Sequence, residues 1–448
     1  MLDIAAAESR TADLVAAATR SGADAADALY VGDAATQVSV RLGELEDVGR
    51  SEGEEIGLRV FVGRRSATVS SSDLSADALA ALVERAVAMA REAPEDPYAG
   101  LAPEDRLLRD EPPAIDADDG GDPAPAALRE RALAAEEAAR AVAGVTNSEG
   151  GGASANRVTI ALATSAGFAR GYRTTGYGCS ASVIAGEGGA MQRDYAFHSA
   201  RYLEDLEASD AIGRRAGERA VARLGPRKLE SGSMPVVYDP RVSASMVGHL
   251  LGAINGAGIA RRTSFLLGKL GERVFAPGIT IVDDPLRLRG LRSKPFDGEG
   301  LPTARRELVQ DGVLTTWLMD SASARQLGLE PTGHAARGTG GAPGASGSNT
   351  YLAAGTLSRD DLIADIKLGV YVTELIGQGV NGITGDYSRG ASGFVIRDGR
   401  IAEAVAEITV AGNLTDMFLH MTPASDLEFR HAVDAPTLRI DGMAIAGA

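Results

Sequence analysis

Three segments in the first part of the chain decide the fold class: Thr36-Gln-Val-Ser-Val-Arg-Leu42, Ile56-Gly-Leu-Arg-Val-Phe-Val62 and Ser66-Ala-Thr-Val-Ser70. Polar and apolar residues alternate within them, which is typical of β-strands that bury one face. The segments follow one another at short spacing, which favours an antiparallel meander, because parallel strands need long crossover connections. The sequence therefore predicts an antiparallel sheet near the N-terminus.

Helical patterns lie on both sides of these strands. Residues 2–20 carry apolar side chains at helical spacing, residues 72–90 begin with several possible N-caps, and residues 126–143 are rich in Ala and Glu. From about residue 145 strand patterns dominate, and helices interrupt them without strict alternation. We therefore predict an α+β fold, with an N-terminal α/β domain of antiparallel strands and flanking helices, followed by a larger β-rich C-terminal domain.

The composition changes between residues 92 and 125. This stretch holds seven of the 18 prolines and many acidic residues, as linkers and solvated loops do. We place the N-terminal domain, including this acidic linker, at residues 1–140 and the C-terminal domain at residues 141–448. In the second domain we expect a glycine-rich loop at 338–350, helices at 208–224 and 241–255, and strands at 157–163, 180–184, 234–238, 279–283, 313–319, 382–386, 393–398, 403–410 and 436–444.

Bulk composition limits the classes of function. The 448 residues are 44% hydrophobic and 24% charged, which is the composition of a soluble globular protein. The net charge of −16 disfavours binding to nucleic acid or to an anionic membrane. The first residues lack the pattern of a signal peptide, and no apolar run reaches the ~20 residues that span a bilayer. The single cysteine, Cys179, allows no disulfide within the chain, so we expect a cytoplasmic protein.

Common catalytic motifs are missing or lack their structural context. None of the five histidines is followed by glutamate, so the chain has no His-Glu-x-x-His zinc helix. The Gly-x-Ser-x-Gly string at 49–53 connects two predicted antiparallel strands, whereas a nucleophile elbow needs a helix after it. The Gly-x-Gly-x-x-Gly string at 377–382 lacks the helix that would hold a pyrophosphate. We interpret the first as a loop and the second as a glycine-rich strand.

Two single residues have both a structural and a functional interpretation. Cys179 is more typical of a small core residue than of a nucleophile. His249 lies in an apolar helical stretch between Gly248 and Leu250, where it is either a hydrogen-bonded structural histidine or part of a site. The sequence alone leaves both interpretations of His249 open.

Several segments also carry a resemblance to a known family. They are 67–75, 147–151, 193–197, 226–229, 248–254, 293–300, 323–329, 372–379, 385–394, 407–414 and 440–447. In this order, and over nearly the whole chain, they resemble the TldD/PmbA family and specifically its TldE branch. The densest part runs from Val372-Thr-Glu-Leu-Ile-Gly-Gln-Gly379 through Gly385-Asp-Tyr-Ser-Arg-Gly-Ala-Ser-Gly-Phe394.

The resemblance implies which chemistry this chain lacks. In the family, the catalytic TldD subunit carries a His-Glu-x-x-x-His helix and a further zinc ligand near its C-terminus. The corresponding helix here is expected to place Ala244 and Ser245 at the first two of these positions and to keep only His249. Ala cannot bind zinc, and Ser cannot replace a carboxylate as general base. We therefore expect no catalytic residue, no metal ligand and no cofactor in this chain, and zinc in the partner subunit.

The resemblance further implies a heterodimer with a TldD-type catalytic subunit, which cleaves unfolded or unstructured peptides in a narrow channel between the subunits. A peptide in such a channel can be held by strand addition. The candidate residues for this contact are His249, Gly385, Asp386, Tyr387, Ser388, Arg389 and Gly390. The family's association with maturation of a peptide antibiotic and with modulation of DNA gyrase is likewise only implied.

Three alternatives remain open at this point. Tyr387 and Arg389 have a structural interpretation, as a turn in a subunit interface. The whole chain could be a stand-alone peptide-binding homodimer without proteolytic activity. It could also be an enzyme with a different site, built from His249 and a nearby carboxylate.

Overall fold

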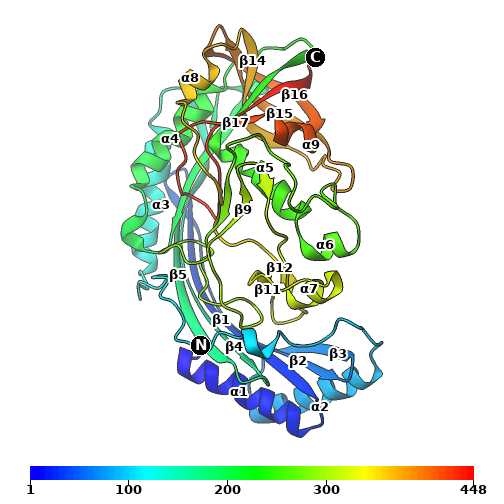
Figure 1. Ribbon diagram of the computed structural model, residues 1–448. Coiled ribbons are helices and arrows are strands. Elements are labelled where there is room, and N and C mark those ends of the chain that lie inside the picture. The colour runs from blue at the N-terminus through cyan, green and yellow to red at the C-terminus, as the bar shows by residue number, and fades with distance from the viewer. Residues whose placement is uncertain (448) are drawn as a thin grey trace.

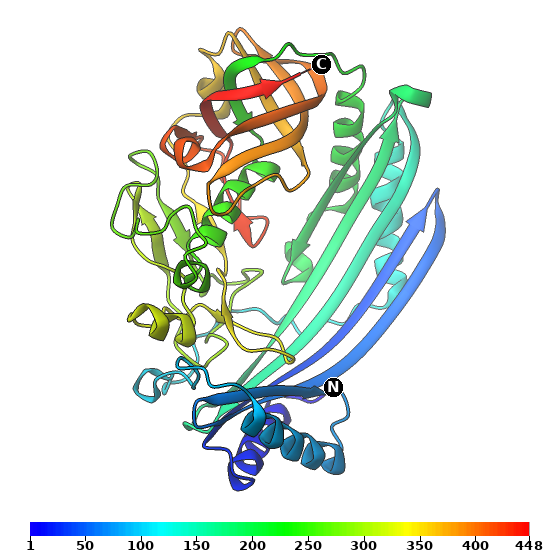
Figure 2. The ribbon, with the colours of Figure 1, turned by 90° about the vertical axis from the view of Figure 1, so that its right-hand side faces the viewer.

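A long, curved antiparallel sheet runs along one side of the molecule, with helices on one face and the C-terminal part of the chain on the other (Figure 1 and Figure 2). The structure is a computed structural model and describes residues 1–447. The sheet has the strand order β3-β2-β1-β4-β5-β6. Its strands are β1 (Ala25–Arg41), β2 (Glu44–Val62), β3 (Arg65–Ser71), β4 (Val145–Thr164), β5 (Ala169–Ala185) and β6 (Gln192–Ala200).

This sheet crosses the boundary that we expected at residue 140. Strand β4 pairs with β1 from Asp27 opposite Thr164 to Val40 opposite Gly151. The segments on either side of residue 140 therefore contribute three strands each to one layer. The acidic stretch at 92–125 contains one short 3-10 helix (Glu104–Arg106) and is fastened to the sheet, since Ala117 accepts a hydrogen bond from the backbone of Thr175 at 2.8 Å.

Two pairs of helices cover one face of the sheet and form two separate cores. The helices are α1 (Ile4–Arg20), α2 (Ala76–Glu92), α3 (Pro125–Arg140) and α4 (Ser209–Ala222). The first pair packs on Tyr30 and Leu58 at one end of the sheet, and the second pair packs on Val38 and Val40 at the other. Helices α3 and α4 approach closely because Gly213 has no side chain, and a Cβ there would lie 1.9 Å from the carbonyl oxygen of Ala135.

The opposite face of the sheet meets the C-terminal part through a small aromatic cluster. Since side chains alternate along a strand, Leu29 of β1 points away from the helices that cover Tyr30. Leu29 packs in the same cluster as Phe168 and Phe296, whose ring centroids are 5.0 Å apart. This contact holds the C-terminal part against the sheet.

The C-terminal part contains a closed ring of strands in the order β16-β15-β14-β7-β19, in which β16 pairs with β19. The strands are β7 (Gly232–Tyr238), β14 (Leu368–Ile376), β15 (Asp386–Arg397), β16 (Arg400–Asn413) and β19 (Leu438–Ala446), and β17 (Met421–Pro423) pairs with β19 outside the ring. Closure removes exposed edges and surrounds an apolar core. The fold is α+β, as the sequence predicts, with an N-terminal antiparallel sheet and helices followed by a larger β-rich part.

A second, smaller sheet with the order β10-β9-β8-β13-β18 lies beside this ring, together with a two-stranded ribbon. Its strands are β8 (Ile281–Asp283), β9 (Arg306–Gln310), β10 (Val313–Leu314), β13 (Thr350–Leu352) and β18 (Val433–Asp434), and the ribbon consists of β11 (Ala335–Ala336) and β12 (Gly344–Ala345). The remaining helices are α5 (Pro240–Ala253), α6 (Gly256–Ala260), α7 (Ser321–Leu327), α8 (Arg359–Ile363) and α9 (Leu414–Leu419), with short 3-10 helices at Gly188–Ala190 and Leu203–Asp205.

One local prediction differs from the structure. Residues 382–385 of the strand predicted at 382–386 form a turn, in which the Asn381 side chain accepts a hydrogen bond from the backbone of Ile383 at 2.9 Å, and β15 begins only at Asp386. Asparagine competes with strand pairing in this way. The glycine-rich loop predicted at 338–350 is attached to β8 near its end, because the Ser348 backbone donates a hydrogen bond to Asp283 at 2.7 Å.

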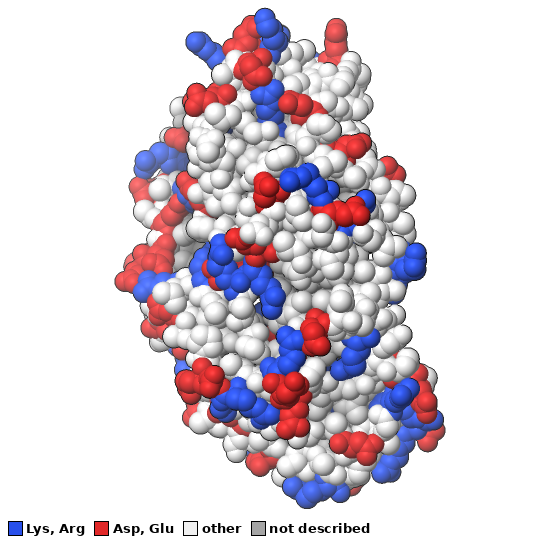
Figure 3. Space-filling model, in the orientation of Figure 1, with Lys and Arg blue, Asp and Glu red and all other residues white. Residues whose placement is uncertain are grey.

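One face of the molecule carries side chains of both charges. On the face seen in Figure 3, basic and acidic side chains are interspersed over large uncharged areas. Among the helices of the described chain, none combines the length and the apolar character that crossing a bilayer requires.

Candidate functional site

Helix α5 starts directly after β7 and presents two different faces. Asp239 caps its N-terminus by accepting from the Arg241 backbone at 3.1 Å, and Pro240 occupies the first turn, where its missing N–H is harmless. One face is buried in the C-terminal core and carries Ser243, Met246, Val247 and Leu250. The other face, at helical spacing, carries Ala244, Ser245, Gly248 and His249, which are half-buried or exposed.

The residues of this outer face do not fit a zinc ion. Ala244 offers no ligand atom, and the Ser245 hydroxyl donates to the carbonyl oxygen of Val242 at 2.6 Å. His249 is the one imidazole there, and the cationic Arg389 lies close enough to affect its titration. Zinc sites take three or four protein ligands, and a nearby positive charge repels a further cation. Within residues 1–447 no group of three or more His, Cys, Asp or Glu side chains is placed to hold a metal ion.

The structure brings three of the predicted candidate residues together. The ring of His249 meets the ring of Tyr387 edge-on, with centroids 5.9 Å apart and an interplanar angle of 78°. Tyr387 and Arg389 lie two residues apart on β15 and therefore point to the same face of that strand. Three buried atoms in this cluster have no hydrogen-bond partner within the described residues: His249 Nε2, Tyr387 Oη and Arg389 Nε.

Burial sets the charge state of this cluster. Burial lowers the pKa of His249 to about 4, and the nearby positive charge of Arg389 adds to the effect. Burial also raises the pKa of Tyr387 to about 12. At neutral pH the imidazole and the phenol are therefore uncharged, and Arg389 is the charged member of the cluster.

The other predicted candidates lie elsewhere. Asp386 is exposed and accepts from the Thr384 hydroxyl at 2.6 Å and from the Asn413 amide at 3.2 Å, which lowers its pKa. Ser388 is exposed on the face of β15 opposite Tyr387. Gly385 belongs to the turn before the strand, with φ +80°, and Gly390 pairs with Ile376 inside the sheet. These four residues do not join His249, Tyr387 and Arg389, although they are neighbours in sequence.

Arg389 opens into a pocket of about 320 Å³ between the N-terminal sheet and the C-terminal part. The pocket is lined by Arg193, Asp194, Tyr195, Arg223, Arg241, Val242, Ser245, Thr373, Glu374, Leu375 and Arg389. A larger groove of about 610 Å³, lined among others by Ala244, lies on the other side of Arg241. The outer face of α5 therefore borders two cavities.

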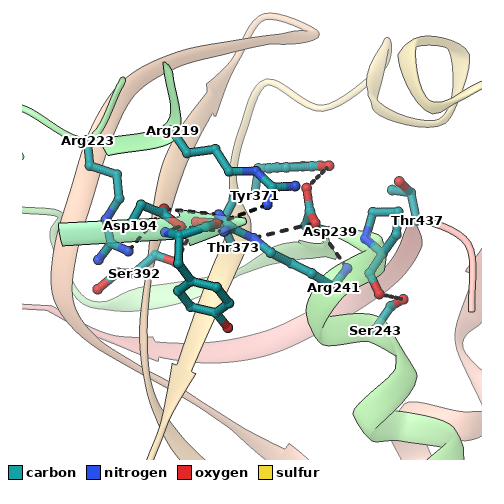
Figure 4. A network of polar contacts seen from close by, with 12 residues as sticks. Asp194, Arg219, Arg223, Asp239, Arg241, Ser243, Tyr371, Thr373, Ser392 and Thr437 are labelled. Atoms are coloured by element: carbon teal, nitrogen blue, oxygen red, sulfur yellow. Dashed lines mark hydrogen bonds and ion pairs between the residues drawn. The ribbon is translucent and has the colours of Figure 1, made fainter. Parts of the chain in front are cut away.

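A buried ion-pair network forms the wall of the smaller pocket (Figure 4). The Asp194 carboxylate, on β6, receives Arg241 Nη1 at 2.8 Å and Arg223 Nη1 at 3.4 Å. Arg223 also reaches Glu374 of β14 at 2.5 Å. Sequence reasoning did not identify these residues, because Asp194 and Arg241 are 47 positions apart and only the tertiary fold joins them.

Two strand edges border the same pocket. Strand β6 is the last strand in its sheet, and among residues 1–447 no strand pairs with its outer side. Strand β14 pairs with β7 only from Val370 to Val372, so Thr373–Ile376 pair on one side alone, with β15. Such edges expose backbone groups that can pair with an extended peptide.

Comparison with known proteins gives matches over most of the chain. Three family models match in order: PmbA/TldA metallopeptidase domain 1 over residues 26–90, the central domain over 118–224, and the C-terminal domain over 231–447. The chain is 40% identical over 412 residues to a protein of Escherichia coli O157:H7 named metalloprotease PmbA, covering 92% of this chain and 89% of that protein.

Solved structures share the fold. A candidate modulator of DNA gyrase from Bacteroides thetaiotaomicron matches with a TM-score of 0.91 at 26% identity, over 98% of this chain and 99% of that one. TldE from Thermococcus kodakarensis matches with a TM-score of 0.87 at 21% identity, over 97% and 99% of the two chains. The second likeness concerns the fold alone.

Proposed function

The chain belongs to the PmbA/TldD family of metallopeptidases, and from this premise we propose that it is the non-catalytic, TldE-type subunit of a two-subunit zinc peptidase. The observation that carries the proposal is the outer face of α5. Ala244 and Ser245 stand there at the positions that the family resemblance assigns to a zinc ligand and a general base, and His249 lies beside Arg389. The chemistry then belongs to a TldD-type partner, which holds the zinc.

The role of this subunit is to stabilise that partner and to line the substrate channel. The open edges of β6 and of β14 beyond Val372 support this role, because both can pair with an extended backbone and neither selects a side-chain sequence. A folded substrate has few free backbone groups, so this mode of binding favours unfolded or unstructured peptides. The candidate contacts from this chain are Tyr387, Arg389 and the neighbouring strand edges.

The test is to purify the chain alone, the TldD-type partner alone and the two together, and to measure zinc content and cleavage of an unstructured peptide. We expect the lone chain to be free of zinc and inert, and the pair to contain zinc and to cleave. A His249→Gln variant of this chain should leave the zinc content of the pair unchanged, since His249 is not a ligand.

Two outcomes would contradict the proposal. Stoichiometric zinc and cleavage in the lone chain would mean that it carries its own catalytic site. A pair that neither associates nor cleaves, while the lone chain forms homodimers that bind peptide, would favour the alternative of a stand-alone peptide-binding protein.

A further inference from the structure

Among the four arginines that line the smaller pocket, Arg389 is the one for which the described part of the chain provides no counterion. The other three arginines that line it each have a carboxylate: Arg193 pairs with Glu149 at 3.3 Å, Arg241 with Asp194 at 2.8 Å, and Arg223 with Glu374 at 2.5 Å. Within residues 1–447 the side chain of Arg389 makes no hydrogen bond and no ion pair, and its Nε is fully buried. The pocket therefore carries one uncompensated positive charge.

An uncompensated, partly buried guanidinium costs free energy unless something pairs with it. Its low-dielectric surroundings, the rings of Tyr387 and His249, would strengthen an ion pair formed there. His249 is uncharged at neutral pH and does not compete for an anion. These features are typical of a site that is completed by a ligand.

We propose that the pocket between β6, α5 and β14 binds a peptide carboxylate, which pairs with the guanidinium of Arg389. This proposal rests on the proposed function, because that function supplies the peptide that carries the carboxylate. The carboxylate is either the C-terminus of the peptide or the side chain of an Asp or Glu residue.

The charge balance and the size of the pocket favour a carboxylate over other anions. A planar guanidinium matches a carboxylate through two parallel hydrogen bonds. One unpaired charge neutralises a monoanion, whereas a phosphate dianion would leave a negative charge beside Asp194 and Glu374. A volume of about 320 Å³ admits one or two residues of an extended chain and no folded domain.

The pocket also lies where a peptide would pass. Both open strand edges, on β6 and on β14, contribute residues to its lining. A peptide paired with either edge places side chains alternately toward and away from the pocket. One carboxylate in register with Arg389 would therefore fix the position of the peptide along the channel.

The experiment is a calorimetric titration of the full-length chain with three acetylated hexapeptides of Gly, Ser and Ala. The first ends in a free carboxylate, the second in a carboxamide, and the third is the carboxamide with a central Asp. We expect the first or the third to bind about tenfold or more tightly than the neutral second, which is the range of charge-assisted hydrogen bonds. The peptide that binds more tightly than the neutral one shows whether the carboxylate comes from the C-terminus or from an acidic side chain.

The variants test the assignment to Arg389. Arg389→Gln should abolish the difference between acidic and neutral peptides, and Arg389→Lys should retain part of it, because a lysine keeps the charge but loses the two-point geometry. Arg214→Gln is the control, since Arg214 lies on α4 outside the lining of the pocket and already pairs with Asp210 at 2.9 Å, and it should keep the preference. Circular dichroism melting curves verify that each variant is folded.

Several results would overturn the inference: no peptide binding, equal binding of all three peptides, an unchanged preference in Arg389→Gln, or displacement of the acidic peptide by inorganic phosphate at lower concentration than by acetate. These readouts need neither zinc nor cleavage. A failure of the carboxylate site is therefore distinguishable from a failure of the proposed subunit role, which the zinc and cleavage measurements report.

Discussion

Arg241 donates two parallel hydrogen bonds to the carboxylate of Asp194, from Nη1 to Oδ1 at 2.8 Å and from Nη2 to Oδ2 at 3.4 Å (Figure 4). Asp194 belongs to β6 of the N-terminal sheet, and Arg241 belongs to the first turn of α5 in the C-terminal part. The Asp194 side chain is 1% exposed. This contact therefore joins two walls of the proposed carboxylate pocket.

Replacing Asp194 by Asn should destabilise the protein strongly. The change leaves Arg241 and Arg223 facing each other without their shared counterion, and removing one partner of a buried pair costs about 3 kcal/mol or more. The measurement is urea unfolding followed by circular dichroism. Asp210→Asn is the control, because the exposed pair of Asp210 and Arg214 on α4 should contribute no more than about 0.5 kcal/mol. Equal effects of the two changes would show that the Asp194 network does not join the two parts.

Gly57 should tolerate no side chain, although it lies in an ordinary strand. A Cβ at Gly57 would lie 2.0 Å from the carbonyl oxygen of Thr339, in the glycine-rich loop of the C-terminal part. Because backbone atoms cannot move aside easily, Gly57→Ala should lower the free energy of unfolding by about 1–3 kcal/mol. Gly49→Ala in the same strand is the control, since its Cβ would have only the Asp47 carboxylate at 3.8 Å. Similar unfolding midpoints for both variants would contradict the close approach.

The antiparallel strands near the N-terminus were predictable because their residues alternate in a simple way. The alternation of apolar and polar residues in 36–42 and 56–62 indicates which side of each strand faces the helices. The observed pairing of β1 with β2 agrees with this alternation. The extent of the sheet was not predictable, since the pairing of β1 with β4 joins segments more than a hundred residues apart. The acidic stretch between them suggested a boundary that the sheet passes across.

The candidate site was predictable only in part, for a similar reason. The spacing of Tyr387 and Arg389 places them on one face of a strand, and the structure adds His249 of α5 to them. Local sequence carries no signal for the ion pairs of Asp194, since its partners come from α5 and from the end of α4. Asp386 is a neighbour of Tyr387 in sequence, but its side chain lies on the opposite face of β15.

Glu299 should make stability depend on pH in an unusual direction. Burial, and then the nearby Asp297 carboxylate, raise the pKa of Glu299 to about 7. At pH values between 4.5, which is the pKa of Glu299 in the unfolded chain, and about 7, the unfolded chain has lost a proton that the folded chain keeps. Stability therefore falls as the pH rises through this window, by up to about 3 kcal/mol from this group.

The Glu299→Gln variant tests this dependence. Glutamine can still accept the hydrogen bond that the Ser321 backbone donates at 2.8 Å, but it carries no charge. The variant should therefore gain stability relative to the wild-type protein as the pH rises from about 4.5 to about 7. Urea unfolding at several pH values measures this difference, and Glu84→Gln on the exposed side of α2 should stay within about 0.5 kcal/mol of the wild type throughout. A difference that does not change with pH would contradict the assignment.

His249 should remain uncharged far below neutral pH, and Arg389 should be part of the reason. Burial is the larger cause of the low pKa of about 4, and the positive charge of Arg389 is the second. The NMR resonance of the His249 ring, assigned by its loss in His249→Asn, should therefore keep its neutral position down to about pH 5, where an ordinary histidine is already protonated.

Removing the charge of Arg389 should raise the pKa of His249, because one of the two causes disappears. The same NMR titration on Arg389→Gln measures this shift. Arg193→Gln is the control, since Arg193 belongs to the rim of the pocket and is paired with Glu149, and it should leave the His249 resonance unchanged. A His249 resonance that titrates near its ordinary value in the wild-type protein, or one that does not respond to Arg389→Gln, would mean that the two side chains do not share the buried environment on which the carboxylate site depends.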